Sequence, residues 1–228
     1  MRADEPAAYG ATTIRSSTTF FTPASTRQVA RVVALLFLAA GAVIMVLHHE
    51  HDMFKMGGLR KKLPVIYWTF LIGAASLAAL PLITAGFYSK DQILWLAWAG
   101  EKGNLWFYLA ALIGAFLTAI YTFRMVFLTF FGEEKTHVGH PAGSLMTIPL
   151  IVLAVLSLAG GFIELPHTMG HITLFSDFLA PVMPAVELRP GTESSELWLQ
   201  AIAGILCLAG IYVAYFFYMK REDLRAEI

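Results

Sequence analysis

Five long apolar stretches constrain the fold of this chain more than any other feature of its sequence. A helix that crosses a bilayer needs about 20 mostly apolar residues. Because unpaired backbone groups are costly in lipid, such stretches are expected to cross as helices. The five expected crossings are Val29–Leu47, Leu63–Phe87, Leu105–Phe131, Leu145–Ile163 and Leu197–Tyr218. We therefore predict an all-α integral membrane protein with about five transmembrane helices.

Composition supports this class and excludes several others. Hydrophobic residues make up 57% of the chain and charged residues 14%, against about a quarter charged in soluble domains. The 16 basic and 16 acidic residues cancel, so no overall field favours nucleic acid or an acidic substrate. A single cysteine, Cys207, excludes a disulfide framework or a cysteine-based metal cluster within the chain.

The polar segments divide the chain into three parts. Residues 1–26 are rich in Ser and Thr and lack a secretory signal, so we expect them to be disordered. Residues 27–220 form the membrane part, in which the connection Glu164–Glu196 contains four prolines and is expected to form short interfacial pieces. Residues 221–228 are expected to be a cytoplasmic tail.

Basic residues predict the orientation. Lysine and arginine in short loops favour the cytoplasmic side. The two basic clusters are Lys55, Arg60, Lys61 and Lys62, and Lys220, Arg221 and Arg225. Four crossings separate them, so both clusters are expected on the same, cytoplasmic side. Arg27 and Arg31 then lie on the opposite side, against the rule.

Lys90 and Asp91 interrupt the second apolar stretch. A straight helix of about 36 residues from Leu63 to Ala99 would be roughly 54 Å long, far more than a hydrocarbon core of about 30 Å. In one interpretation the helix ends near Phe87 and Lys90 extends to the headgroups. In the other, the helix breaks inside the membrane and Lys90 lies at depth.

Local sequence is compatible with a break. Pro81 removes a backbone donor and Gly86 loosens a helix. Ser89 would then cap a new helix whose positive end favours Asp91. Irregular backbone in the membrane is tolerated where it lines a polar cavity. In such a place desolvation disfavours the ammonium form of Lys90, which suits a proton carrier.

Arg124, in "YTFRMVF", is a second charge within an apolar stretch. It could extend to the far interface or pair with a carboxylate of a neighbouring segment or subunit. Thr118, Tyr121 and Thr122 lie on or near the same helix face and could hold water.

The run "HHEHD" contains His48, His49, Glu50, His51 and Asp52. Neighbouring side chains on one helix diverge, so we expect a polar helix end that passes protons and not a metal site. We also expect no cofactor within this chain.

Several stretches resemble a known family. "ALLFLAAGAVI", "HHEHDMFKMGGLRKKLP", "LPLITAGFYSKDQIL" and "GAFLTAIYTFRMVFLTFFG" closely resemble the C-terminal half of the antiporter-like subunit L of bacterial NADH–quinone oxidoreductase, respiratory complex I. The mitochondrial counterpart is subunit 5. The resemblance is close from about Ala34 to Phe131 and looser to Lys220.

The resemblance implies that Leu80–Leu94 belongs to a discontinuous transmembrane helix. It implies that Lys90 carries an ion beside its acidic neighbour Asp91, ending a mid-membrane chain of polar residues and delivering a proton towards the outer face. Arg124 falls on the family's "YTxR" pattern, where a packing or ion-pair role is implied. His48, His49 and Glu50 match a family loop.

The same resemblance implies partners and location. Other membrane subunits of complex I and the lipid bilayer would surround the chain in the bacterial inner membrane. The ion would be H⁺ or Na⁺, and NADH, FMN, Fe–S clusters and quinone would bind other subunits. No nucleic acid is expected.

The sequence also departs from the family pattern. Val33 in "VARVVALLFL" stands where the family's "HAFFKALLFL" has a lysine, and the upstream half-channel and the lateral helix have no equivalents. We therefore expect a fragment of a subunit more than twice as long, contributing one proton half-channel to NADH:quinone oxidoreductase. The alternatives are a fragment of the large subunit of a multi-subunit Na⁺/H⁺ antiporter, or a nonfunctional membrane relic.

Overall fold

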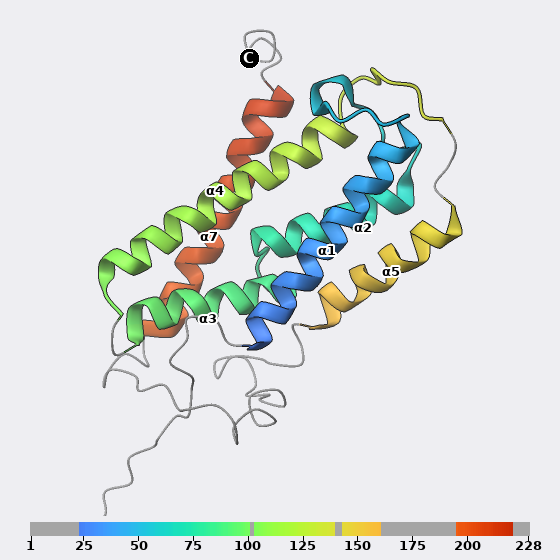
Figure 1. Cartoon of the computed structure of the whole chain (residues 1–228). Helices are drawn as coiled ribbons and strands as arrows, with labels where there is room; N and C mark the ends of the chain where they lie inside the picture. Colours follow the sequence, from blue (N-terminus) through green and yellow to red (C-terminus); the bar gives the residue numbers. More distant parts are fainter. Residues whose placement is uncertain (1–22, 101–102, 140–142, 161–194, 221–228) are drawn as a thin grey trace, which may run out of the picture.

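The computed structural model describes residues 23–100, 103–139, 143–160 and 195–220, and this part of the chain is built from helices (Figure 1). The long helices are α1 (Pro23–Val46), α2 (Pro64–Ala78), α3 (Ala85–Ala99), α4 (Leu105–Phe130), α5 (Ser144–Ala159) and α7 (Glu196–Tyr215). Two short pieces, η1 (Met53–Lys55) and η5 (Phe216–Lys220), lie near one end of the bundle.

The helices alternate in direction along the chain. In Figure 1, α1, α4 and α7 run from the lower to the upper end, and α2, α3 and α5 run back down. The helices α2 and α3 together make one downward passage, so the five expected crossings correspond to α1, α2 with α3, α4, α5 and α7. The predicted all-helical class with one discontinuous helix is confirmed.

Helix boundaries differ from the expected crossings in several places. By length and composition, Leu105–Phe130 and Glu196–Lys220 can each cross a membrane, whereas Ala30–Val46, Pro64–Ala78 and Ser144–Ala159 are shorter apolar helices. α1 begins at Pro23, so it includes residues 23–26 of the segment predicted to be disordered. Residues 1–22, 161–194 and 221–228 lie outside the described residues, and with them most of the proline-rich connection and the predicted tail.

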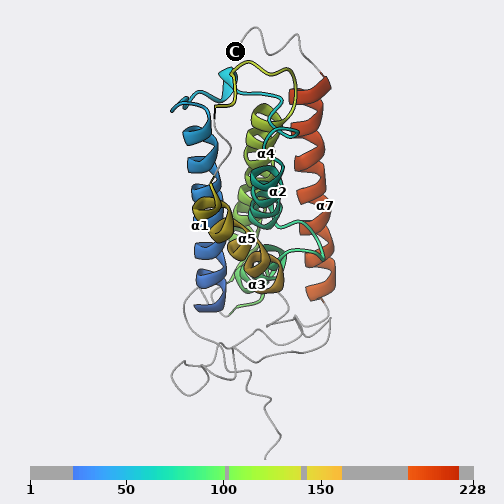
Figure 2. The same ribbon diagram turned by 90° about the vertical axis from the view of Figure 1, so that its right-hand side faces the viewer.

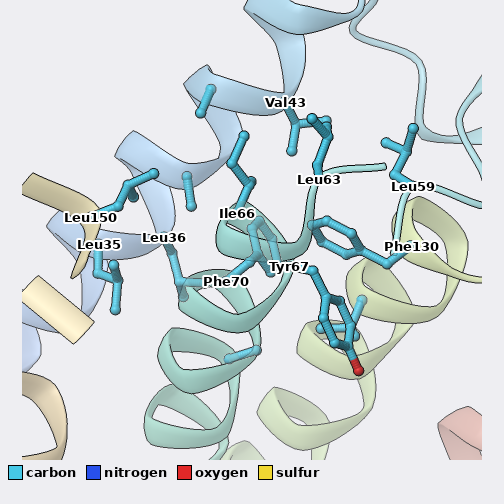
Figure 3. Close-up of a cluster of buried hydrophobic side chains, with 14 of the residues drawn as sticks. Leu35, Leu36, Val43, Leu59, Leu63, Ile66, Tyr67, Phe70, Phe130 and Leu150 are labelled. Atoms are coloured by element: carbon cyan, nitrogen blue, oxygen red, sulfur yellow. The ribbon is translucent and has the colours of Figure 1, made fainter. Parts of the chain in front are cut away.

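The main hydrophobic core lies between α1, α2, α5 and the end of α4 (Figure 3). Leu35 of α1, Ile66 of α2 and Leu150 of α5 are each at most 1% exposed. The ring of Phe130 lies 5.4 Å from that of Tyr67 and 5.3 Å from that of Phe70, distances at which aromatic pairs add stability beyond burial. This packing fixes α2, and with it the start of the broken passage.

The loop between α1 and α2 is attached to the end of α4. The N–H groups of Gly58 and Arg60 donate to the carbonyl oxygens of Phe131 and Phe130, both at 3.2 Å. At Gly57, φ is +154° and a Cβ would lie 2.2 Å from the carbonyl oxygen of Glu133, so only glycine fits. The loop lies at the upper end of the helix bundle in Figures 1 and 2, and η5 lies at the same end.

This arrangement brings the described parts of both basic clusters to one end. Lys55 lies in η1 and Lys220 in η5. A shared end of the bundle agrees with the prediction that the clusters share one side of the membrane; Arg221 and Arg225 lie outside the described residues.

Candidate functional site

The second crossing is broken between α2 and α3. α2 ends at Ala78, and α3 begins seven residues later at Ala85. Ala79 and Leu82 both adopt φ of 66°, a left-handed conformation that ends a helix. The N–H of Leu80 donates to the carbonyl oxygen of Ala75 at 2.9 Å, and Pro81 then has no N–H to continue the ladder.

Gly86 allows the two half-helices to overlap side by side. Its N–H donates to Ser76 Oγ at 3.2 Å. A Cβ at Gly86 would lie only 1.7 Å from the carbonyl oxygen of Ser76. Gly86 is thus required for the close approach of α3 to α2. The sequence alone predicts only that this glycine loosens a helix.

Ser89 does not cap the second half-helix, and that prediction was wrong. The N-cap residue of α3 is Thr84, five residues earlier, and Ser89 and Asp91 lie inside the helix. Asp91 therefore gains no stabilisation as a first-turn residue at a helix end. Ser89 Oγ is buried without a hydrogen-bond partner among the described residues.

Lys90 points its amine into the protein. Its Nζ atom is buried and has no hydrogen-bond partner within the described part of the chain. Lys90 lines a cavity of about 10 Å³, about the smallest that can hold one water molecule. The other lining residues are Ala78, Ala79, Phe87, Asp91, Leu94, Ala115, Ala203 and Cys207.

The cavity lies at mid-length of the two long helices. Ala115 is ten residues into α4, and Cys207 is eleven residues into α7, so each lies roughly 15 Å from its helix start. That is about half of a hydrocarbon core of about 30 Å. Of the two interpretations left open by the sequence, the structure agrees with the one in which Lys90 lies at depth.

The Asp91 carboxylate is hydrogen-bonded to a side chain of α7. Asp91 is 5% exposed, and its Oδ2 accepts a hydrogen bond of 2.8 Å from Nε2 of Gln200 on α7. Tyr108 of α4 and Glu196 of α7 are near enough to interact with it electrostatically. Gln200 was not among the predicted site residues; the available signal was an amide inside the apolar run "LWLQAIAG".

Arg124 lies between two aromatic rings. Its Cζ is 5.7 Å from the ring centroid of Phe54 in η1 and 5.4 Å from that of Tyr218 in η5, within the range of cation–π attraction. No salt bridge joins Arg124 to a carboxylate of the described residues, so the ion-pair interpretation finds no support among them. Arg124 joins α4 to both short pieces at the upper end.

The polar neighbours of Arg124 do not form one water-holding face. Tyr121 is 49% exposed and Thr122 is fully buried. Thr118 Oγ1 donates to the carbonyl oxygen of Gly114 at 2.6 Å. None of the three lines the cavity at Lys90.

The histidine-rich run forms a turn after α1. His48 and His49 have φ of 55° and 66°. The Glu50 carboxylate accepts from the N–H groups of His51 at 3.0 Å and Asp52 at 2.9 Å. These bonds, foremost that from Asp52, lower the pKa of Glu50 despite some desolvation, with help from Lys55 at 3.6 Å. In the described residues, these side chains do not form a cluster suited to a metal ion.

Comparison with known proteins identifies relatives of this chain. Residues 29–118 match the family described as NADH:quinone oxidoreductase/Mrp antiporter, TM. The chain is 43% identical over 196 residues to NADH-quinone oxidoreductase subunit L of Escherichia coli, covering 86% of this chain and 29% of that protein. Identity is 47% over 191 residues to the subunit L of Pseudomonas aeruginosa, with 83% and 28% covered.

A relative named as chain 5 matches as well. NADH-ubiquinone oxidoreductase chain 5 of Rhizopus stolonifer is 38% identical over 196 residues, covering 81% of this chain and 30% of the relative. The chain belongs to the antiporter-like subunit L family. The matched region spans under a third of each of these relatives. The family match includes the break, Lys90 and Asp91 but not Arg124 or Gln200.

Proposed function

We propose that this subunit L family member forms a proton half-channel in the membrane arm of NADH:quinone oxidoreductase. The observation that carries the proposal is the Lys90 amine, which is buried at mid-length of the bundle beside a broken helix and has no hydrogen-bond partner among the described residues. The redox reaction takes place in other subunits, and this chain moves the ion.

Burial gives Lys90 the property that a carrier needs. Moving an ammonium group out of water disfavours its charged form, and intramembrane ionisable groups mark ion pathways. The cavity has room for about one water molecule, with which the amine can exchange a proton. Discontinuous helices commonly build ion sites near the bilayer midplane, and the α2–α3 break has this form.

We also propose partners and a location for this chain. Other membrane subunits of complex I and lipid cover the outer faces of α4, α5 and α7, on which Trp106, Leu145 and Trp198 are 75% exposed or more. The protein crosses the bacterial inner membrane several times, with the basic end in the cytoplasm. NADH, FMN, Fe–S clusters and quinone bind in other subunits.

The test is a Lys90→Ala variant in the assembled complex. Proton uptake and NADH oxidation are measured together in inverted membrane vesicles. We expect a lower proton-to-electron ratio and slower coupled turnover, because the buried carrier is gone. Lys61→Ala, at an exposed loop lysine, is the matched control and should keep the wild-type ratio. An unchanged ratio in Lys90→Ala would contradict the proposal.

A Na⁺/H⁺ antiporter fragment is the second candidate, since the matched family includes Mrp antiporters. The names of the relatives favour the quinone oxidoreductase. Co-purification with quinone reductase subunits would support complex I; co-purification with antiporter subunits and Na⁺-dependent transport would support the antiporter. Deletion without effect on respiration would support a nonfunctional relic.

A further inference from the structure

One face of α7 covers the helix break. Gln200, Gly204 and Cys207 follow one another at intervals of four and three residues, and so lie on one side of the helix. Cys207 Sγ donates to the carbonyl oxygen of Ala78 at 3.1 Å. At Gly204, a Cβ would lie 3.2 Å from Cγ of Pro81. All three residues therefore contact the broken helix at the level of the Lys90 cavity.

Gln200 is hydrogen-bonded to Asp91, a charged side chain that lines the Lys90 cavity. Gln200 and Asp91 are each 5% exposed, and their side chains are joined by the 2.8 Å bond from Nε2 to Oδ2. A hydrogen bond to a carboxylate is strong when little water competes for it, and leaving a buried acceptor unpaired is costly. The bond therefore holds the Asp91 carboxylate in one orientation.

Fixing Asp91 also fixes Lys90. The two residues are neighbours on α3 and line the same cavity. Rotation of α3 about its axis would move both side chains and would break the bond to Gln200. We propose that Gln200 is a positioning residue of the half-channel, which holds the Asp91 carboxylate and thereby the direction of the Lys90 amine. This inference rests on the proposed function of Lys90.

A neutral amide suits the charges around Asp91. The titratable groups that interact with Asp91 are Tyr108 on α4 and Glu196 on α7, and its neighbour Lys90 on α3 interacts with Cys207 on α7. α2 and α5 contain no charged residue, and Arg31 of α1 lies beside Gly160 at the end of α5. Glu196 is one helical turn before Gln200. A carboxylate at position 200 would thus stand next to one acidic group and one turn from another.

The test compares Gln200→Leu, Gln200→Glu and the control Ile202→Leu in the assembled complex. Ile202 is 42% exposed on another face of α7. Gln200→Leu removes the donor, so the proton-pumping rate should fall about tenfold at every pH, the effect expected for one hydrogen bond to a charged group. Ile202→Leu should pump as the wild type does.

The pH dependence of pumping in Gln200→Glu distinguishes a hydrogen-bonding role of Gln200 from a packing role. Its carboxyl group can donate to Asp91 only while protonated, so pumping should approach the wild-type rate at low pH and fall as pH rises. The wild type and Ile202→Leu should lack this added dependence. Equal losses in both Gln200 variants at all pH values would show a packing role and overturn the inference. Wild-type pumping in both variants would overturn it as well.

The amount of assembled complex is measured for every variant. If Gln200→Leu does not assemble, the pH dependence of Gln200→Glu, which preserves side-chain shape, decides the question. Lys90→Ala separates this inference from the proposed function. A lowered proton-to-electron ratio in Lys90→Ala with normal Gln200 variants removes only the role of Gln200, whereas a normal ratio in Lys90→Ala removes the proposed half-channel.

Discussion

At the scale of single residues, Gly86 decides whether the broken passage can form. The first turn of α3 lies against the last turn of α2, and the N–H of Gly86 donates to Ser76 Oγ. Any side chain at this position would overlap the backbone of Ser76. The sequence suggested a break from Pro81 and Gly86, but the start of α3 could not be located, because it depends on this contact between two helices and not on a local cap at Ser89.

Gly86→Ala should therefore destabilise the protein. Because the new Cβ would lie 1.7 Å from the carbonyl oxygen of Ser76, the half-helices must separate, at a cost of about 2–3 kcal/mol. Gly114→Ala in α4 is the matched control: a Cβ there has nothing within 4 Å, and alanine favours a helix by about 1 kcal/mol. Thermal unfolding of the purified complex measures both, and equal transition temperatures would contradict the account.

Glu50 makes the stability of the turn after α1 dependent on pH. Its pKa is lowered by the N–H bonds from Asp52 and His51 and by Lys55. A lowered pKa stabilises the turn above the ordinary carboxyl pKa, and this stabilisation is lost as pH falls through the value in the folded protein. Exchange protection of the Asp52 amide should therefore fall between about pH 5 and pH 3. Glu50→Gln should show no such step; a step of equal size there would exclude Glu50 as its source.

At the scale of elements, Arg124 connects α4 to η1 and η5 through the rings of Phe54 and Tyr218. The sequence located the charge and left open whether Arg124 extends to the far interface or pairs with a carboxylate. It did not indicate the two rings, which come from segments 70 residues before and 94 residues after Arg124. The same limit applied to Gln200, whose partner Asp91 is 109 residues away. Apolar runs and prolines predict helices and breaks from neighbouring residues alone. Contacts between helices join residues far apart in the sequence and so have no local signal.

A double-mutant cycle measures the arginine contact. Tyr218→Leu should cost less stability in an Arg124→Gln background than in the wild type, with a coupling of about 0.5–1 kcal/mol between the guanidinium and the ring. Tyr215→Leu is the control, because Tyr215 packs on Phe127 and not on Arg124. Thermal unfolding of the wild type, the two single variants and the double variant gives the coupling, and a value near zero would show that the two groups lie together without attraction.

At the scale of the whole molecule, the alternating directions of the helices were predictable from the five apolar runs, since each run must cross and return. The loop between α1 and α2, which contains basic residues, and η5, which ends at Lys220, lie at one end of the bundle, and the end of α3 and the start of α4 lie at the other (Figure 1). The depth of Lys90 was not predictable from the residues alone, because the length of the run allowed either a snorkelling lysine or a broken helix. In the structure α2, α4 and α7 pack around α3 and enclose Lys90, which favours the broken helix.

The topology predicts which positions react with a labelling reagent from the same side of the membrane. Lys61→Cys and Lys220→Cys should react with a membrane-impermeant maleimide from one side of the membrane, and Asn104→Cys from the other. Cys207 is buried and should stay unreactive in each variant. Reaction of all three positions from the same side would contradict the five alternating passages.

Lys90→Cys in the same labelling assay tests the central claim most directly, which is that position 90 is enclosed by protein at mid-depth of the membrane. The account predicts that an impermeant maleimide labels Lys90→Cys far more slowly than Lys61→Cys from either side, in complexes confirmed to be intact. Labelling of Lys90→Cys as fast as Lys61→Cys would place it in bulk water and would contradict the account.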